Sequence, residues 1–173
     1  MKSIQIGGVS KSYTEGVLAL DATIAGYAHE GGRAIVICVN KWDRIAEGKK
    51  REFERNLRDQ MKFMEYAPVV FLSAKTGVGV KALFKVIREV DDSASMRVTT
   101  GELNRFVESL HFEERKIFYV TQPTVRPPTF VLFTNNAAPL HFSHERYLIN
   151  QIRKRFGFRG TPVVVKTKAR KKA

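Results

Sequence analysis

The longest apolar run in the chain spans only six residues, 34–39, and a polar segment, 40–43, follows it directly. A membrane-spanning helix needs about 20 apolar residues, so a run of this length cannot cross a bilayer. It is instead typical of a strand that is buried on both faces, as in a parallel sheet covered by helices. A second strand of this kind is predicted over residues 69–72. The two runs limit this part of the chain to a layered α/β arrangement.

Helical patterns alternate with these two strands. Apolar residues recur at helical spacing over residues 16–29, 47–64 and 80–90. The order helix–strand–helix–strand–helix predicts an α/β unit over residues 16–92, with a right-handed crossover between parallel strands. Phe84 is among the residues expected to face inward from the third helix. Residues 1–15 show no clear period and stay unassigned.

The pattern changes after residues 91–95, which have the composition of a linker. Thr99 or Thr100 is a candidate N-cap for a helix to about residue 110, and Ser143 is one for a helix that ends at Gly157. β-Branched and aromatic residues predict three strands, over residues 115–122, 128–135 and 161–167. Residues 97–173 are therefore expected to form an α+β domain in the order α-β-β-α-β.

The positive charge of the chain is concentrated in this second unit. The net charge is +13, and residues 97–173 carry 15 Lys and Arg against 5 Asp and Glu. A small basic domain favours a polyanionic partner, and nucleic acid is the usual one. A solvated charged surface is the alternative. The candidate RNA-binding residues lie around the end of the second helix and in the basic C-terminal tail: Arg153, Lys154, Arg155, Arg159, Lys166 and Lys168.

Two other features of the second unit suggest RNA binding but are explained more simply by structural roles. Residues 157–160 fit the G-x-x-G pattern that clamps RNA backbone in KH domains, but here the pattern joins a helix to a strand. A helix C-cap and a turn are the simpler explanation. Strand alternation predicts that most of four aromatic side chains belong to the core rather than to a stacking surface: Phe118, Tyr119, Phe130 and Phe133.

Cysteine content and the N-terminus bear on the compartment. Cys38 is the one cysteine, which excludes an internal disulfide, and its apolar surroundings predict a buried, inert thiol. No apolar segment of the secretory-signal type follows Lys2. We therefore expect a soluble cytoplasmic protein with no membrane partner.

The polar segment after the first strand contains Asn40, Lys41, Trp42 and Asp43. In open α/β sheets, ligands bind beyond the carboxyl ends of the strands. The Asp43 carboxylate can accept hydrogen bonds from the ring N–H and the amino group of guanine, which adenine does not offer together. Asn40 can brace the loop and approach the ring, and the Lys41 stem can lie on one face of it.

The second strand ends in a similar way, with Ser73, Ala74 and Lys75 ahead of Thr76 and Gly77. A backbone N–H in this segment can donate to the guanine keto oxygen, and Lys75 can cover the opposite ring face. Each segment alone is also typical of an ordinary turn. The two together, in this order and 33 residues apart at strand ends, predict a guanine-binding site.

These two segments resemble the base-recognition motifs of translation-factor-class GTPases. Further segments resemble the Der (EngA) family of bacterial ribosome-assembly GTPases, at residues 127–133, 141–143, 146–148 and 156–162. The family has two tandem GTPase domains and a C-terminal KH-like domain. The resemblance, from about residue 16 onward, implies the last part of a P-loop GTPase domain and a complete KH-like domain. It further implies GTP or GDP as ligand, and ribosomal RNA and the large ribosomal subunit as partners.

The sequence departs from the family at the phosphate-binding loop. That loop needs G-x-x-x-x-G-K-[ST], because its backbone N–H groups wrap the phosphates and its hydroxyl holds Mg²⁺. With Lys11 as the lysine, Gln5 and Ser10 stand where glycines are required, and no D-x-x-G occurs. We therefore expect that this chain alone does not hold Mg²⁺, binds nucleotide weakly at best and does not hydrolyse GTP.

Three interpretations stay open. The chain is a C-terminal portion of a Der-like GTPase with unrelated residues 1–15, a stand-alone basic RNA-binding or ribosome-associated module without nucleotide dependence, or a non-functional fragment. A sheet of two strands would also leave an unpaired edge. The first unit is then expected to be the less stable one, or to associate through that edge.

Overall fold

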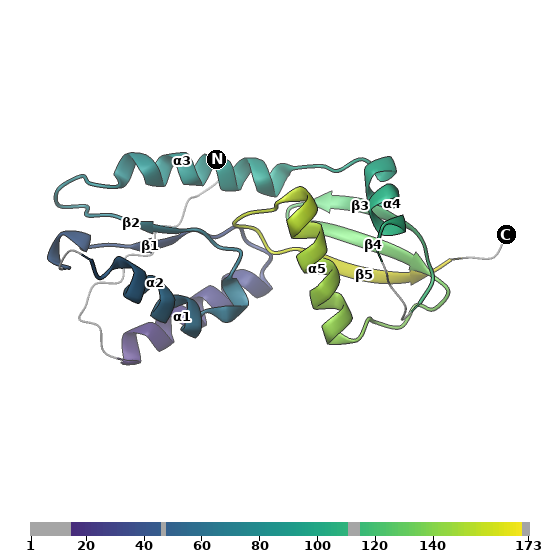
Figure 1. The fold of residues 1–173 in the computed structure, drawn as a ribbon, viewed down its shortest axis with the longest axis horizontal. Coiled ribbons are helices and arrows are strands. Elements are labelled where there is room, and N and C mark those ends of the chain that lie inside the picture. The colour runs from purple at the N-terminus through teal and green to yellow at the C-terminus, as the bar shows by residue number, and fades with distance from the viewer. Residues whose placement is uncertain (1–14, 46–47, 111–114, 171–173) are drawn as a thin grey trace.

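The computed structural model describes residues 15–45, 48–110 and 115–170. Within these ranges, a two-stranded parallel sheet is followed by a three-stranded mixed sheet, and helices pack on both sheets (Figure 1). None of the described helices is long and apolar enough to span a membrane.

The first unit alternates helices and strands as predicted. Its main elements are α1 (Glu15–Glu30), β1 (Ile37–Val39), α2 (Lys50–Gln60), β2 (Val69–Phe71) and α3 (Val80–Ser95). In Figure 1, α1 and α2 lie on one side of the sheet and α3 runs along the other. The apolar core of this unit lies between α1, α2 and the sheet, and its buried members are Val39, Leu57, Met61, Met64 and Ala67.

Several details of this unit differ from expectation, and its described sheet has two strands. β1 covers half of the predicted run, and the predicted second helix divides into α2 and a 3₁₀ turn, Lys62–Met64. Cys38 is exposed rather than buried, and Phe84 is 63% exposed. Nearby chain still desolvates the Cys38 thiol enough to raise its pKa. Association through the edge of this sheet stays a prediction.

The predicted linker over residues 91–95 is wrong, because α3 continues through it. Val90 and Ala94 are spaced one helical turn apart and both are buried, which holds the last turns of the helix in place. The Ser95 hydroxyl also donates to the Asp91 carbonyl over 2.9 Å. A continuous helix therefore leads out of the first unit.

The second unit has the predicted α-β-β-α-β order. Its elements are α4 (Thr100–Glu108), β3 (Ile117–Val125), β4 (Pro128–Thr134), α5 (Phe142–Phe156) and β5 (Val164–Ala169), and the sheet order is β3-β4-β5. β3 and β4 pair antiparallel, whereas β4 and β5 pair parallel. Both helices contribute to one core, which includes Leu103, Phe106, Val120, Phe130, Leu132, Leu148 and Ile152.

Local hydrogen bonds explain where these helices begin and end. Thr99 and Glu102 form the reciprocal capping box that starts α4. The expected N-cap of α5, Ser143, is wrong: His141 occupies that position and its ring accepts from the Ser143 N–H. Gly157 ends α5 with a φ of 95°, as predicted.

The two units are joined by direct contacts at Gly160. Its N–H donates to the Tyr66 carbonyl over 2.8 Å, and its carbonyl accepts from the Ile35 N–H over 2.6 Å. Gly160 has a φ of +74°, and a Cβ built on it would lie 2.4 Å from a Val90 methyl group. Only glycine fits this conformation and this close approach without strain.

Replacing Gly160 with alanine should therefore destabilise the chain by more than backbone strain alone would cause. Gly77 is the matched control, since its φ of +77° is similar and no atom lies within 4 Å of a built Cβ. We expect Gly77→Ala to lower the free energy of unfolding by about 1 kcal/mol. Gly160→Ala should lower it by about 2–4 kcal/mol, because overpacking adds to strain. Urea unfolding measures both, and equal losses would contradict the close packing.

Candidate functional site

The two predicted guanine loops lie side by side because β1 and β2 are parallel and end at the same edge of their sheet. The Asn40 side chain joins them. Its Oδ1 accepts from the Lys41 N–H over 2.8 Å and from the Ala74 N–H over 3.0 Å. The Trp42 N–H also donates to the Leu72 carbonyl over 3.1 Å. Asn40 therefore braces the site, as its sequence position suggested.

The Asp43 carboxylate is exposed at this edge, within the 3₁₀ turn Trp42–Arg44. A hydrogen bond from Ser73 is the main cause that lowers the pKa of Asp43, and the charges of Arg44 and Lys75 act in the same direction. The carboxylate is consequently ionised at neutral pH. An ionised carboxylate is the acceptor that a guanine edge, with two adjacent donors, requires.

The second loop is held by its own hydrogen bonds. The Ser73 hydroxyl is buried and accepts from the Thr76 N–H over 3.2 Å, and the Gly77 N–H donates to the Ser73 carbonyl over 2.9 Å. Lys75 is exposed. Because Asn40 already accepts from the Ala74 N–H, a guanine oxygen could use that donor only by sharing it.

An aromatic cluster that motif reading did not single out supports the first loop. The Trp42 ring lies 4.4 Å from that of Phe71 and 5.7 Å from that of Phe53, measured between centroids. Both contacts are edge-to-face, which is a favourable geometry for aromatic pairs. The cluster fixes the 3₁₀ turn that carries Asp43 against β2 and α2.

The described residues do not include the segment in which a phosphate-binding loop was sought. The segment at residues 5–12, which departs from the phosphate-loop pattern, lies outside the described residues. Across residues 15–45, 48–110 and 115–170, no group of three or more His, Cys, Asp and Glu is arranged to hold a metal ion.

The structure separates the six predicted RNA-binding residues into three places. Arg153 and Arg159 lie at the contact with the first unit. Lys154 and Arg155 are exposed at the end of α5, and Lys166 and Lys168 are exposed on β5. The basic composition of this domain gave no indication of this division.

Comparisons with known proteins agree with this architecture. Residues 97–168 match the family described as the KH-domain-like C-terminal domain of EngA bacterial GTPase enzymes. GTPase Der of Bacillus mycoides is 47% identical over 167 residues, and that of Bacillus thuringiensis is 48% identical. The chain is a homologue of the Der (EngA) GTPases. The similarity covers 90% of the chain, which spans 38% of the length of these curated relatives.

Arg153 attaches the KH-like domain to the first unit. Its guanidinium lies 4.5 Å from the centre of the Tyr66 ring and donates to the carbonyls of Phe158 and Thr161, over 2.6 and 2.8 Å. Burial lowers the pKa of Arg153 to about 10, so the group stays charged at neutral pH. Its contact with RNA stays a prediction, and these contacts compete with it.

His29 completes this interface from the end of α1. Its Nδ1 and the Tyr66 hydroxyl are hydrogen-bonded over 2.9 Å. Burial is the main cause that lowers the pKa of His29; Arg153 acts in the same direction and Glu30 opposes them. Burial also raises the pKa of Tyr66 to about 12. The sequence offered no sign that these residues, far apart in the chain, form one cluster.

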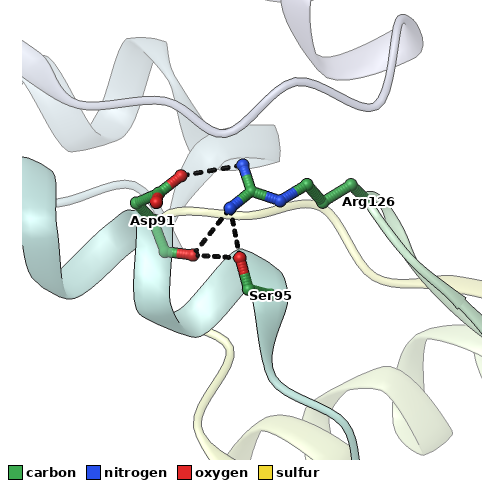
Figure 2. Close-up of polar contacts among 3 residues, drawn as sticks. All are labelled: Asp91, Ser95 and Arg126. Carbon is green, nitrogen blue, oxygen red and sulfur yellow. Dashed lines mark hydrogen bonds and ion pairs between the residues drawn. The ribbon is translucent and has the colours of Figure 1, made fainter.

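The β3–β4 turn makes a further contact with the end of α3. Figure 2 shows the Arg126 guanidinium reaching both Asp91 and Ser95. The ion pair with the Asp91 carboxylate measures 2.7 Å. Arg126 and Asp91 are both more than a third exposed, so solvent screens the pair and its contribution to stability is small.

Acidification should weaken this interface through His29. The folded chain disfavours the charged imidazole, whereas an unfolded chain takes up its proton near pH 6.5. The contribution of His29 to the free energy of unfolding is therefore fully present above about pH 6.5, and it is lost as the pH falls through the lowered pKa of His29. Urea unfolding between about pH 7.5 and pH 5.5 should show this loss, and His29→Gln should reduce the slope. An unchanged slope in the variant would exclude His29 as its source.

Proposed function

We propose that the chain acts in ribosome biogenesis as the C-terminal part of a Der-like GTP-binding protein. Its KH-like domain contacts ribosomal RNA in the assembling large subunit, in the cytoplasm. The observation that carries this proposal is the docking of a strongly basic KH-like domain, through Gly160 and Arg153, on a unit whose two loops have guanine-recognition chemistry. The similarity to GTPase Der over most of the chain supports the same reading.

Charge supports RNA as the partner of the KH-like domain. Residues 97–173 contain 5 acidic residues and 15 Lys and Arg. Lys154 and Arg155 extend into solvent from the end of α5. Lysine and arginine side chains bind phosphate oxygens, which gives affinity without reading sequence.

RNA binding by this domain should weaken steeply with salt. Each contact with a phosphate of single-stranded RNA adds about −0.7 to the slope of log K against log salt. Replacing both Lys154 and Arg155 with glutamine should make that slope shallower by about 1.4. Fluorescence anisotropy with a ribosomal RNA fragment measures this, and Lys81→Gln/Lys85→Gln on α3 is the control. Absent or salt-insensitive binding by the wild-type chain would overturn the proposal.

The loops support recognition of a guanine base. Asp43 supplies an ionised acceptor, and Asn40 holds the second loop beside it. The stems of Lys41 and Lys75 can lie against the ring faces. The sequence contains no phosphate-binding motif for GTP or GDP. Contacts with the base would therefore supply most of the affinity, and we do not expect this chain to hydrolyse GTP.

Nucleotide binding should therefore be weak and independent of the phosphates. Labelled GDP titrated against the chain, with unlabelled guanosine and adenosine as competitors, measures this directly. GDP and guanosine should bind alike, and adenosine should bind more weakly. Asp43→Asn should weaken guanosine binding by at least about tenfold, as expected for loss of a charged hydrogen bond of about 1.5–3 kcal/mol. Micromolar or tighter binding of GDP would show that phosphate contacts exist.

A stand-alone RNA-binding module without nucleotide dependence is the second candidate. The absence of G-x-x-x-x-G-K-[ST] and D-x-x-G from the sequence favours it. The two candidates differ in the GDP titration. They also differ in whether guanosine changes RNA affinity, which happens only if the loops and the KH-like domain act together.

A further inference from the structure

The three-stranded sheet packs one face against α4 and α5, and the side chains of its other face range from the buried Val131 to the exposed Lys166 and Lys168. The buried residues Val120, Phe130 and Leu132 face the helices and belong to the core. Successive side chains of a strand point to opposite faces, so Tyr119 and Phe133 lie on the other face. Strand register confirms that these two residues are direct neighbours on β3 and β4. We call this surface the open sheet face.

Tyr119 and Phe133 form an aromatic stack on the open sheet face. Their ring centroids are 4.2 Å apart and their planes differ by only 13°. Tyr119 is 36% exposed, whereas Phe133 is half-buried. Strand alternation predicted that most of the four aromatic side chains in β3 and β4 belong to the core. This prediction is wrong: of the four, Phe130 is a core residue, whereas Tyr119 and Phe133 lie on the opposite face and Phe118 is exposed. An exposed ring already stacked on a second one is a rigid platform for a flat ligand.

Positive charge borders the aromatic stack. Lys168 lies opposite Phe133 in the register, and Lys166 lies opposite Val131 on the same face. Both lysines are exposed. At the end of the sheet, the Arg170 guanidinium lies 5.0 Å from the centre of the Phe118 ring, which is also exposed. The three strands contain no Asp or Glu.

We propose that the open sheet face binds single-stranded RNA, with a base stacked on Tyr119 and the adjoining phosphates held by Lys166 and Lys168. This inference rests on the proposed function, because it assigns a surface to RNA binding by the KH-like domain. Stacking on exposed aromatic rings beside a cationic groove is the general means of holding single strands. An apolar protein segment fits less well, since the centres of protein interfaces are depleted of charged residues.

Substitution at Tyr119 tests the stack. Tyr119→Phe keeps a flat ring, whereas Tyr119→Leu keeps an apolar side chain without one. Anisotropy with fluorescein-labelled oligouridine should show near wild-type affinity for Tyr119→Phe and a loss of at least about fivefold for Tyr119→Leu. Circular dichroism and thermal unfolding establish that both variants fold. Equal affinities for the two folded variants would overturn the inference.

The two lysines are tested by charge removal. Lys166→Gln/Lys168→Gln should make the salt slope shallower by about 1.4, and Lys81→Gln/Lys85→Gln should leave it unchanged. If Lys154→Gln/Arg155→Gln alone changes the slope, RNA binds at the end of α5; the inference then fails while the proposed function stands. If the wild-type chain binds no RNA at all, both fail.

Cross-linking of the wild-type chain gives an answer that does not depend on variants. An oligouridine that carries 4-thiouridine, irradiated in complex with the chain, should attach to the peptide that contains Tyr119 or the one that contains Phe133. Attachment confined to α5 would overturn the inference. The inference would also be overturned if a protein partner bound the open sheet face and oligouridine did not compete with that partner.

Discussion

Two backbone hydrogen bonds of Gly160 join the two units. Its N–H and its carbonyl each form a hydrogen bond with the first unit, one to Tyr66 ahead of β2 and one from Ile35 ahead of β1. The KH-like domain is therefore attached at the N-terminal ends of the same two strands whose C-terminal ends carry the guanine loops. Because these hydrogen bonds are made by the backbone, side-chain substitution at Tyr66 or Ile35 cannot remove them directly.

The polar side chains at this interface contribute unequally. The Arg159–Glu89 pair measures 2.8 Å, but both side chains are at least 40% exposed, so water screens their attraction. Arg153 is more enclosed, and two carbonyl acceptors and the Tyr66 ring compensate for its loss of water. Removing Arg153 would leave buried carbonyls without donors, which costs more than losing an exposed ion pair. Arg153 thus holds the loop that contains Gly160 and contacts Tyr66 of the first unit with the same guanidinium.

Local patterns were sufficient to predict much of the fold. Strand and helix order, the Thr99 cap and the Gly157 terminus all follow from residues close together in the chain. The exposure of Cys38 and Phe84 did not, because it depends on how many strands the sheet contains, which no local pattern encodes. The Asn40 bridge was foreseeable, since the carboxyl ends of parallel strands meet at one edge. The cluster of His29, Tyr66 and Arg153 was not, because it forms only when the two units dock.

The different positions of the basic residues follow from the periods of the elements that carry them. Consecutive residues of a helix point in directions about 100° apart, so Arg153, Lys154 and Arg155 cannot share one environment. Once Arg153 packs on Tyr66, its two neighbours are turned toward solvent. Lys166 and Lys168 are two apart on a strand and therefore must share a face. Composition alone describes one basic domain. Periodicity divides its basic residues into an attachment point at Arg153, a cationic surface at Lys154 and Arg155, and a second one at Lys166 and Lys168.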